Sequence, residues 1–339
     1  MKIKIIIAIC LSIVSIVLGI AIGSVNIPTA DVLRVLGNHL FGFELPEHIT
    51  QGRSAIVWSQ RFPRAILAFF AGAALSVSGA VMQSVLRNPL ASSYTLGVSS
   101  GASLGASLVI LAGVTLPLFP ILSLPVLGFT FGLATILLVM AIARQLDVRI
   151  ENHTIILTGM VFALFINAIS TLMFSFFRES TQRMIFWQMG SFRLLGWNTV
   201  YILVPIALIG IFFISRFKWE LDVMTFGEEQ AQSIGVNSRK IKLVLLVTAA
   251  ALTGSTIAFV GVIGFVDLVS PHVVRKIYGS SHKLVIPMSA LIGGSFMVLA
   301  DLVARTVTSP VELPVGAVTA LIGAPFFAYI YFNKRKERV

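Results

Sequence analysis

Long apolar runs dominate this chain and restrict what it can fold into. Nine of them are long enough to cross a bilayer, at residues 5–23, 65–82, 94–112, 117–141, 154–177, 199–215, 243–260, 284–304 and 313–333. A spanning helix needs about 20 apolar residues, and lipid admits only helices or closed barrels. Only 12% of the 339 residues are charged, against roughly 25% in soluble domains. The sequence therefore predicts an all-α integral membrane protein with one transmembrane domain over residues 1–339.

A tenth, weaker segment at residues 262–274 decides the orientation. It is apolar but short, and Gly264, Asp267 and Pro271 interrupt it. Counting it as a span returns the basic tail at 334–338 to the side of the N-terminus. Most of the 25 Lys and Arg residues then lie on that side, as the positive-inside rule requires. We expect about ten helices in the cell membrane, with both termini in the cytoplasm.

The most informative polar interruption is residues 221–237, LDVMTFGEEQAQSIGVN. Lys and Arg flank it on both sides, and a short helix-forming stretch lies between Gly227 and Gly235. That stretch begins with Glu228, Glu229, Gln230 and Ala231. Such a segment has no role inside a bilayer. It is typical of a structured cytoplasmic element that docks a partner protein.

The chain has no recognisable chemistry of its own. The single cysteine, Cys10, lies in the first apolar run, so we expect neither a disulfide framework nor a thiol metal site. The sequence contains no His, Cys and Glu set with metal-ligand spacing, no nucleophile with a base, and no phosphate-binding loop. The net charge of +11 follows from basic loops rather than nucleic-acid binding. We therefore expect a protein that is not an enzyme and binds no cofactor.

Ionisable residues within the apolar segments are few. Asp301 and Arg305 are four positions apart, so we expect an ion pair on one helix. Asp267, on the broken segment, is the one candidate for binding a coupling ion near mid-membrane. An ion-coupled secondary transporter using Asp267 therefore stays as the alternative to a transporter driven by another polypeptide.

The arginines at the predicted outer side have two possible roles. Arg61 and Arg64 precede the second apolar run, and Arg305 follows the run at 284–304. They could extend to lipid headgroups, or they could form a positive outer face that docks an acidic partner. Small residues at 71–80, 97–107 and 290–295 predict close helix packing in the membrane.

Several stretches together resemble one family, the permease subunits of type II ABC importers for iron-siderophores, haem and cobalamin. The stretches are RFPRAILAFFAGAALSVSGAVMQSVLRNPLA (61–91), LGVSSGA (96–102), FGEEQAQSIGV (226–236), IGFVDLVSPHVVRKIYG (263–279), P-x-S-A-L-I-G-G (287–294), A-D-x-x-A-R (300–305) and ELPVGAVTALIGAPFF (312–327). They run over nearly the whole chain in the family's order.

The resemblance implies a fold like that of the cobalamin-importer permease and several partners. These are a second permease, identical or related, two cytosolic ATPases that hold ATP and Mg, and an extracytoplasmic binding protein. The segment 221–237 would be the element that couples the permease to the ATPase. It includes Gly227, Glu228, Glu229, Gln230, Ala231 and Gly235.

The resemblance also assigns residues to docking and to gating. Arg61, Arg64 and Arg305 correspond to arginines that meet acidic residues of the binding protein. Asn88 and Leu90 belong to the N-P-L-A turn of the cytoplasmic gate. A second gate position corresponds to about Asn152 and His153, where the family often has small hydroxyl residues.

Two positions depart from the family pattern. Asp267 stands where the family commonly has glycine. Ser92-Ser93 stands where the family usually has an acidic residue followed by proline. We expect Asp267 to be solvated at a helix break and to influence the pathway; the alternative is a hydrogen-bonded residue at the break. An iron-siderophore is the expected cargo because it is common in this family, with cobalamin or haem as the alternative.

Overall fold

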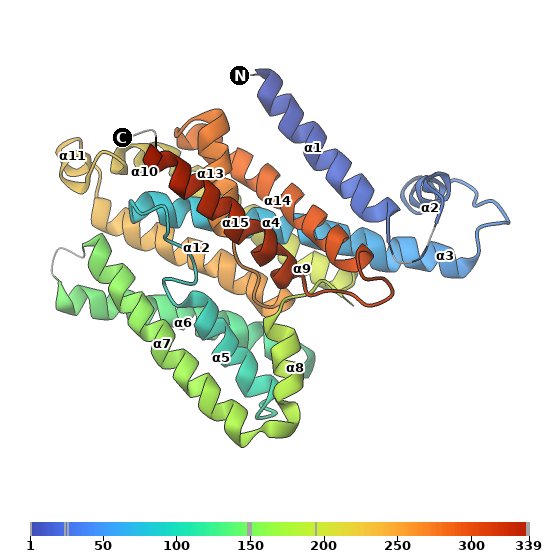
Figure 1. The fold of residues 1–339 in the computed structure, drawn as a ribbon, viewed down its shortest axis with the longest axis horizontal. Helices are drawn as coiled ribbons and strands as arrows, with labels where there is room; N and C mark the ends of the chain where they lie inside the picture. Colours follow the sequence, from blue (N-terminus) through green and yellow to red (C-terminus); the bar gives the residue numbers. More distant parts are fainter. Residues whose placement is uncertain (1, 24, 26, 148–150, 194, 337–339) are drawn as a thin grey trace.

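The computed structural model describes residues 2–23, 25, 27–147, 151–193 and 195–336. Every regular element in these ranges is helical (Figure 1). Seven helices in the described part are long and apolar enough to cross a membrane. They are α1 (Lys2–Ala21), α4 (Phe62–Val85), α6 (Ser123–Leu146), α7 (Asn152–Phe176), α9 (Trp197–Ser215), α12 (Ser238–Val260) and α14 (His282–Thr306). The all-α membrane fold expected from the sequence is confirmed.

Three further apolar segments form shorter or less regular helices, which are α5 (Val98–Ile110), α13 (Val266–Tyr278) and α15 (Val315–Lys336). The expected helix at 94–112 begins only at Val98, because Thr95 instead closes a turn by donating a hydrogen bond of 2.9 Å to the Ser92 carbonyl. The segment before α13 stays non-helical up to Phe265, which has a positive φ of 69°. The count of ten spans therefore stays a prediction.

The connections also contain helices that the sequence did not suggest. Between the first two spans lie α2 (Thr29–Phe41), α3 (Gln51–Ala55) and the π-helical turn η1 (Ile56–Arg61), which continues directly into α4. A 3₁₀ turn, η2 (Pro120–Leu122), leads into α6, and α8 (Arg178–Gln188) follows α7. These elements lie at the end of the bundle where α4 begins.

The other end of the bundle carries α10 (Lys218–Met224) and α11 (Glu228–Ser233); we call it the α11 end. The start of α1 lies there too, because Lys4 Nζ donates to the Ile277 carbonyl at 3.0 Å beside the turn between α13 and α14. Figure 1 shows the last turns of α15 at the same end. The cytoplasmic orientation of this end stays a prediction.

The centre of the bundle is α4, which is almost entirely buried. Its small residues let neighbouring backbones approach closely, as the sequence predicted. A Cβ added to Gly72 would lie 2.3 Å from the backbone carbonyl oxygen of Gly293 in α14. A Cβ added to Gly79 would lie 1.9 Å from the backbone carbonyl oxygen of Asp267 in α13. Both helices are therefore packed backbone to backbone against α4.

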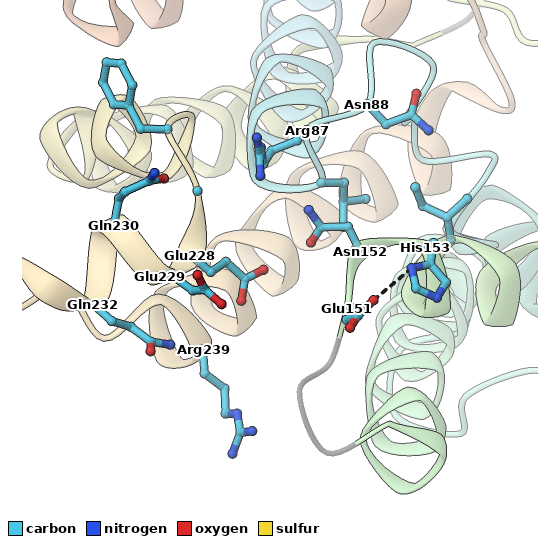
Figure 2. A pocket seen from close by; sticks show the side chains of 14 residues that line it. Arg87, Asn88, Glu151, Asn152, His153, Glu228, Glu229, Gln230, Gln232 and Arg239 are labelled. Carbon is cyan, nitrogen blue, oxygen red and sulfur yellow. Dashed lines mark ion pairs between the residues drawn. The ribbon is translucent and has the colours of Figure 1, made fainter.

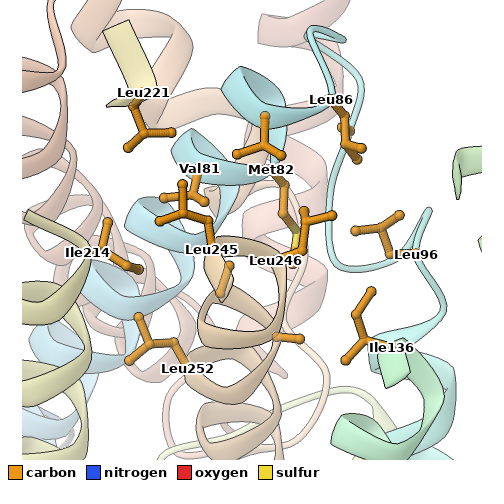
Figure 3. Packing of buried hydrophobic residues seen from close by; sticks show 14 of the residues in the cluster. Val81, Met82, Leu86, Leu96, Ile136, Ile214, Leu221, Leu245, Leu246 and Leu252 are labelled. Atoms are coloured by element: carbon orange, nitrogen blue, oxygen red, sulfur yellow. The ribbon is translucent and has the colours of Figure 1, made fainter. Parts of the chain in front are cut away.

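Figure 3 shows the largest buried hydrophobic cluster, which lies toward the α11 end. Val81 and Met82 of α4 meet Leu245 and Leu246 of α12 in it. Leu221 of α10 packs into the same cluster and is fully buried. The predicted docking segment is therefore held on the transmembrane core by hydrophobic packing.

Candidate functional site

The segment 221–237 is a structured element rather than an extended loop. Its helix α11 lies between Gly227 (φ 131°) and Gly235 (φ 88°), which confirms the short helix expected between these glycines. These positive φ angles favour glycine because it has no Cβ. Met224, Ala231 and Val236 are buried in the core cluster together with Leu221.

Most of the rest of this segment is exposed, and part of it (Phe226, Glu229 and Gln230) also lines the pocket described next. Phe226 and Ile234 are 74% and 57% exposed, and Glu229 and Gln230 are exposed beside them. Two large apolar side chains that stay exposed on an otherwise well-packed element are typical of a protein contact surface. Neither residue was predicted as a contact residue. In the sequence, only the position of these two apolar residues among polar ones indicates that they are exposed.

A pocket of about 1010 Å³ separates α11 from the transmembrane helices. Figure 2 shows it between α11, the end of α4 and the start of α7. Asn88 lines it from the turn after α4, and Asn152 and His153 line it from the first turn of α7. The structure thus brings the two predicted gate positions and the predicted coupling helix around one cavity. Leu90 is 44% exposed and does not line it.

A buried lysine connects two sides of this pocket. Lys242 of α12 is 1% exposed, and its ammonium donates to Asn152 Oδ1 at 2.8 Å. The same ammonium pairs with the Glu228 carboxylate of α11. Glu228 is therefore turned inward, whereas Glu229 beside it is exposed. The sequence showed Lys242 only as one of several flanking charges, because its role depends on contacts between three separate helices.

A second set of polar contacts anchors α10. Asp222 accepts hydrogen bonds from the His282 backbone N–H at 2.7 Å and from Ser281 Oγ at 3.1 Å. It thereby satisfies donors at the N-terminus of α14. The His282 ring lies between Asp222 (2.6 Å) and Ser84 Oγ of α4 (2.6 Å). This arrangement fixes α10 to α14 and α4.

The set of Asp222, His282 and Ser84 resembles the catalytic triad of a hydrolase in its order of carboxylate, imidazole and hydroxyl. Its hydrogen bonds do not allow the serine to act as a nucleophile. The Ser84 hydroxyl donates to the Ala80 carbonyl at 2.8 Å, and Arg275 donates to Ser84 Oγ at 2.9 Å. The imidazole must then donate to Ser84, whereas a nucleophilic serine requires a histidine that accepts its proton. All three form a structural network.

The three predicted docking arginines lie at the end opposite α11, but they do not form an exposed positive face. Arg61 and Arg305 are each 4% exposed. Arg61 donates to the Ala21 carbonyl at 2.8 Å, and Arg305 donates to the Gly19 carbonyl. These two side chains are buried because their guanidinium groups satisfy backbone carbonyls at the end of α1, and the docking role of the arginines stays a prediction.

Arg64 is held by two carboxylates of its own chain. Its Nε and Nη2 donate to Asp301 at 2.9–3.1 Å, and Nη1 and Nη2 each donate to Glu312 at 3.1 Å. The expected ion pair between Asp301 and Arg305 is present at 3.6 Å. Arg64 is nevertheless the closer partner of Asp301. An acidic partner protein would have to compete with Asp301 and Glu312 for Arg64.

Asp267 is buried at the start of α13 and is only 2% exposed. The expectation of a solvated carboxylate is therefore wrong. Its Oδ2 accepts a hydrogen bond of 3.4 Å from the Ser93 N–H, whereas Oδ1 is buried without a hydrogen-bond partner. The geometry fits the alternative of a hydrogen-bonded residue at the helix break. Among the described residues, no three His, Cys, Asp or Glu side chains are grouped to hold a metal ion.

Comparison with known proteins identifies the family. The model of the FecCD transport family matches residues 10–333. The chain belongs to the FecCD transport family. It is 40% identical over 323 residues to the uncharacterized ABC transporter permease YvrB of Bacillus subtilis, covering 95% of this chain and 91% of that one. This confirms the resemblance to ABC importer permeases and the placement in the cell membrane as a multi-pass protein.

Other FecCD relatives have named cargoes. The Fe(3+)-citrate import permease YfmE of Bacillus subtilis is 37% identical, with 95% of this chain and 92% of that one covered. The hemin permease HmuU of Yersinia pestis is 35% identical, with 82% and 83% covered. A solved structure described as an inward-facing conformation of a metal-chelate type ABC transporter superposes with a TM-score of 0.84 at 26% identity. It covers 98% of this chain and 100% of its own.

Proposed function

We propose that this chain is the transmembrane permease of an ATP-driven importer for an iron-siderophore complex. It receives the complex from an extracytoplasmic binding protein, works as a dimer with a second permease, and is driven by two cytosolic ATPases. ATP and Mg bind to those ATPases, which carry out the hydrolysis.

One observation carries the coupling role. The α11 helix and the gate positions Asn88 and Asn152 line the same pocket, and Lys242 links Glu228 to Asn152. A force applied to α11 by a partner has a direct path to the first turn of α7. The exposed side chains of Phe226 and Ile234 offer that partner an apolar contact.

Co-purification tests the ATPase contact. Glu229→Arg should lose an ATPase that co-purifies with the tagged wild type, because Glu229 is exposed on α11. Glu47→Arg makes the same charge reversal at an exposed position at the opposite end and should retain it. Glu229 is preferred to Glu228 because reversal of Glu228 would also break the pair with Lys242. Equal recovery of the ATPase in both variants would contradict the assignment.

The cargo is inferred from relatives that are named as iron-citrate and hemin permeases. Reconstituted complex should hydrolyse ATP faster when the binding protein carries an iron-siderophore than when it carries haem or cobalamin. Stimulation by haem or cobalamin alone would select the alternative cargo.

Docking of the binding protein by Arg61, Arg64 and Arg305 is retained as part of the proposal. In this arrangement Arg64 would have to exchange Asp301 or Glu312 for an acidic residue of the partner. An exchange of that kind predicts that binding weakens in Arg64→Gln and becomes less sensitive to salt. Unchanged affinity and salt dependence would remove Arg64 from the contact.

The ion-coupled alternative rests on Asp267 as the coupling residue. It predicts that uptake into vesicles stops when an uncoupler is added while the ATP concentration is held constant. The proposal predicts that uptake continues under these conditions and stops when ATP is removed.

A further inference from the structure

We propose that a groove between α6 and α12, at the α11 end, binds one anionic phospholipid. The groove has a volume of about 430 Å³, within the range of roughly 300–1,000 Å³ seen for ligand pockets. Glu228 of α11 lines it, whereas Phe226, Glu229 and Ile234 do not, so it differs from the exposed residues proposed to contact an ATPase. The inference goes beyond the proposed function and takes from it only the assignment of the α11 end to the cytoplasm.

The inner part of the groove is apolar. Leu137, Met140 and Ala141 line it from α6, and Leu243 lines it from α12. Leu137 and Leu243 are 47% and 42% exposed, although they lie on membrane-spanning helices. Side chains of this kind on a spanning helix face lipid, so an acyl chain is the natural occupant of this part.

The outer part of the groove is cationic. Arg144 comes from the last turn of α6, and Arg239, Lys240 and Lys242 come from the start of α12. Among the described lining residues, Glu228 is the one acidic side chain, and it is paired with Lys242. The lining therefore has a positive balance where the helices end, which is complementary to a phosphate headgroup.

The apolar and cationic parts follow one another along the helices as the parts of a phospholipid do. On α6, Leu137, Ala141 and Arg144 are spaced by four and three residues and so lie on one face. From Leu137 to Arg144 the helix rises about 10 Å. On α12, Lys240 and Leu243 repeat this order over three residues. Basic pockets between spanning helices on the cytoplasmic side are suited to anionic headgroups.

The groove adjoins the coupling pocket. Arg239 and Glu228 line both cavities. A lipid whose phosphate is held by Arg144 and Lys240 would therefore lie beside the Glu228–Lys242 pair and restrict the movement of α11. Anionic lipid would in this way set how firmly the coupling helix is held.

Native mass spectrometry of the full-length chain tests the proposal, with phosphatidylglycerol and phosphatidylcholine as the two probes. Wild type should retain one phosphatidylglycerol in preference to phosphatidylcholine. Arg144→Gln with Lys240→Gln should weaken that retention by about 25-fold, taking roughly fivefold for each basic residue. Arg239 is left intact because it also lines the coupling pocket.

Two further variants make the test specific. Lys276→Gln with Lys283→Gln removes the same charge from exposed positions at the α11 end, outside the groove, and should retain the lipid. Ala141→Phe fills the apolar part without changing any charge and should lose it. Thermal unfolding of each variant in phosphatidylcholine shows whether it is folded.

Several outcomes would overturn the proposal. One is equal retention of phosphatidylglycerol by all folded variants. Another is displacement of the lipid by inorganic phosphate at equal concentration, which would indicate an anion site without an acyl-chain contact. A third is a dimer of the chain that excludes lipid from the groove. None of these measurements needs ATPase or cargo, so they are independent of the test of the transport function.

Discussion

Lys242 of α12 donates a hydrogen bond of 2.8 Å to the side-chain oxygen of Asn152 at the start of α7, although the two residues are 90 positions apart. The same ammonium pairs with Glu228 of α11. A buried charge that loses its partners is costly. Movement of α11 away from the bundle therefore separates the Glu228 carboxylate from Lys242 at a cost in free energy.

The first prediction concerns this link. Lys242→Met removes the cation and leaves the Glu228 carboxylate, 29% exposed in its side chain, without its partner. We expect a loss of about 2–3 kcal/mol in unfolding free energy, below the value for a fully buried pair. Thermal unfolding in detergent measures the stability, and the ratio of cargo transported to ATP hydrolysed measures the coupling.

The double variant Lys242→Met with Glu228→Gln separates charge pairing from packing. Glu228→Gln removes the unpaired carboxylate, so the double variant should recover part of the stability that Lys242→Met loses. It should not recover coupling, because the contact from α11 to Asn152 is still absent. Full additivity of the two single changes would contradict a direct interaction.

A second prediction concerns the carboxylates around Arg64. Arg64→Gln leaves Asp301, 1% exposed in its side chain, with the more distant Arg305 as its cation. We expect unfolding free energy to fall by about 3–5 kcal/mol. The measurement is the thermal midpoint compared with that of Arg53→Gln, an exposed position at the same end that should change little. A similar midpoint in both variants would show that the Arg64 contacts do not stabilise the fold.

A third prediction tests the close approach of α4 to α13. Gly79→Ala places a Cβ 1.9 Å from the backbone oxygen of Asp267, so the helices must separate. Overpacking against backbone should cost at least about 3 kcal/mol. Gly196→Ala is the matched control because no atom lies within 4 Å of its added Cβ. If Gly79→Ala folds as stably as the control, the helices are not packed this closely.

A fourth prediction concerns Asp267. Asp267→Asn keeps an oxygen that can accept from the Ser93 N–H and removes the charge, so ATP-driven uptake should stay near the wild-type rate. Asp267→Gly removes the acceptor and should lower stability while leaving the dependence on ATP unchanged. Uptake that disappears in Asp267→Asn, with stability intact, would support the ion-coupled alternative.

Much of the fold follows from the sequence because lipid imposes a simple rule on helix length and polarity. The seven long helices and the short helix between Gly227 and Gly235 were predicted in place. The helices at 29–61 were not, since they are short and lack the long apolar run that marks a spanning helix.

The contacts of the charged residues were predictable only where partners are close in sequence. Asp301 and Arg305 are on one helix and were predicted to pair. The hydrogen bond from Arg64 to Glu312 joins residues 248 positions apart, and the link from Lys242 to Asn152 joins α12 to α7. Such contacts depend on how the helices are arranged around one another, and this arrangement cannot be predicted from local sequence patterns.

The two departures from the family pattern turn out to be neighbours. The Ser93 N–H donates to the Asp267 carboxylate, and Ser93 Oγ lies 2.9 Å from Thr253 Oγ1 of α12. The family's acidic residue beside position 93 is absent here, and a carboxylate from α13 reaches the same turn. Ser93 and Asp267 are therefore in direct contact.

The burial of α4 has a practical consequence for changing what the protein carries. Helices α1, α9, α12, α13 and α14 of the same chain contact α4, and glycine contacts hold two of them against its backbone. In the proposed dimer of permeases, a cargo that moves along the outward faces of the bundle would not meet this helix. A library intended to retarget the permease can therefore keep residues 62–85 constant and place its diversity on the outward faces of the surrounding helices.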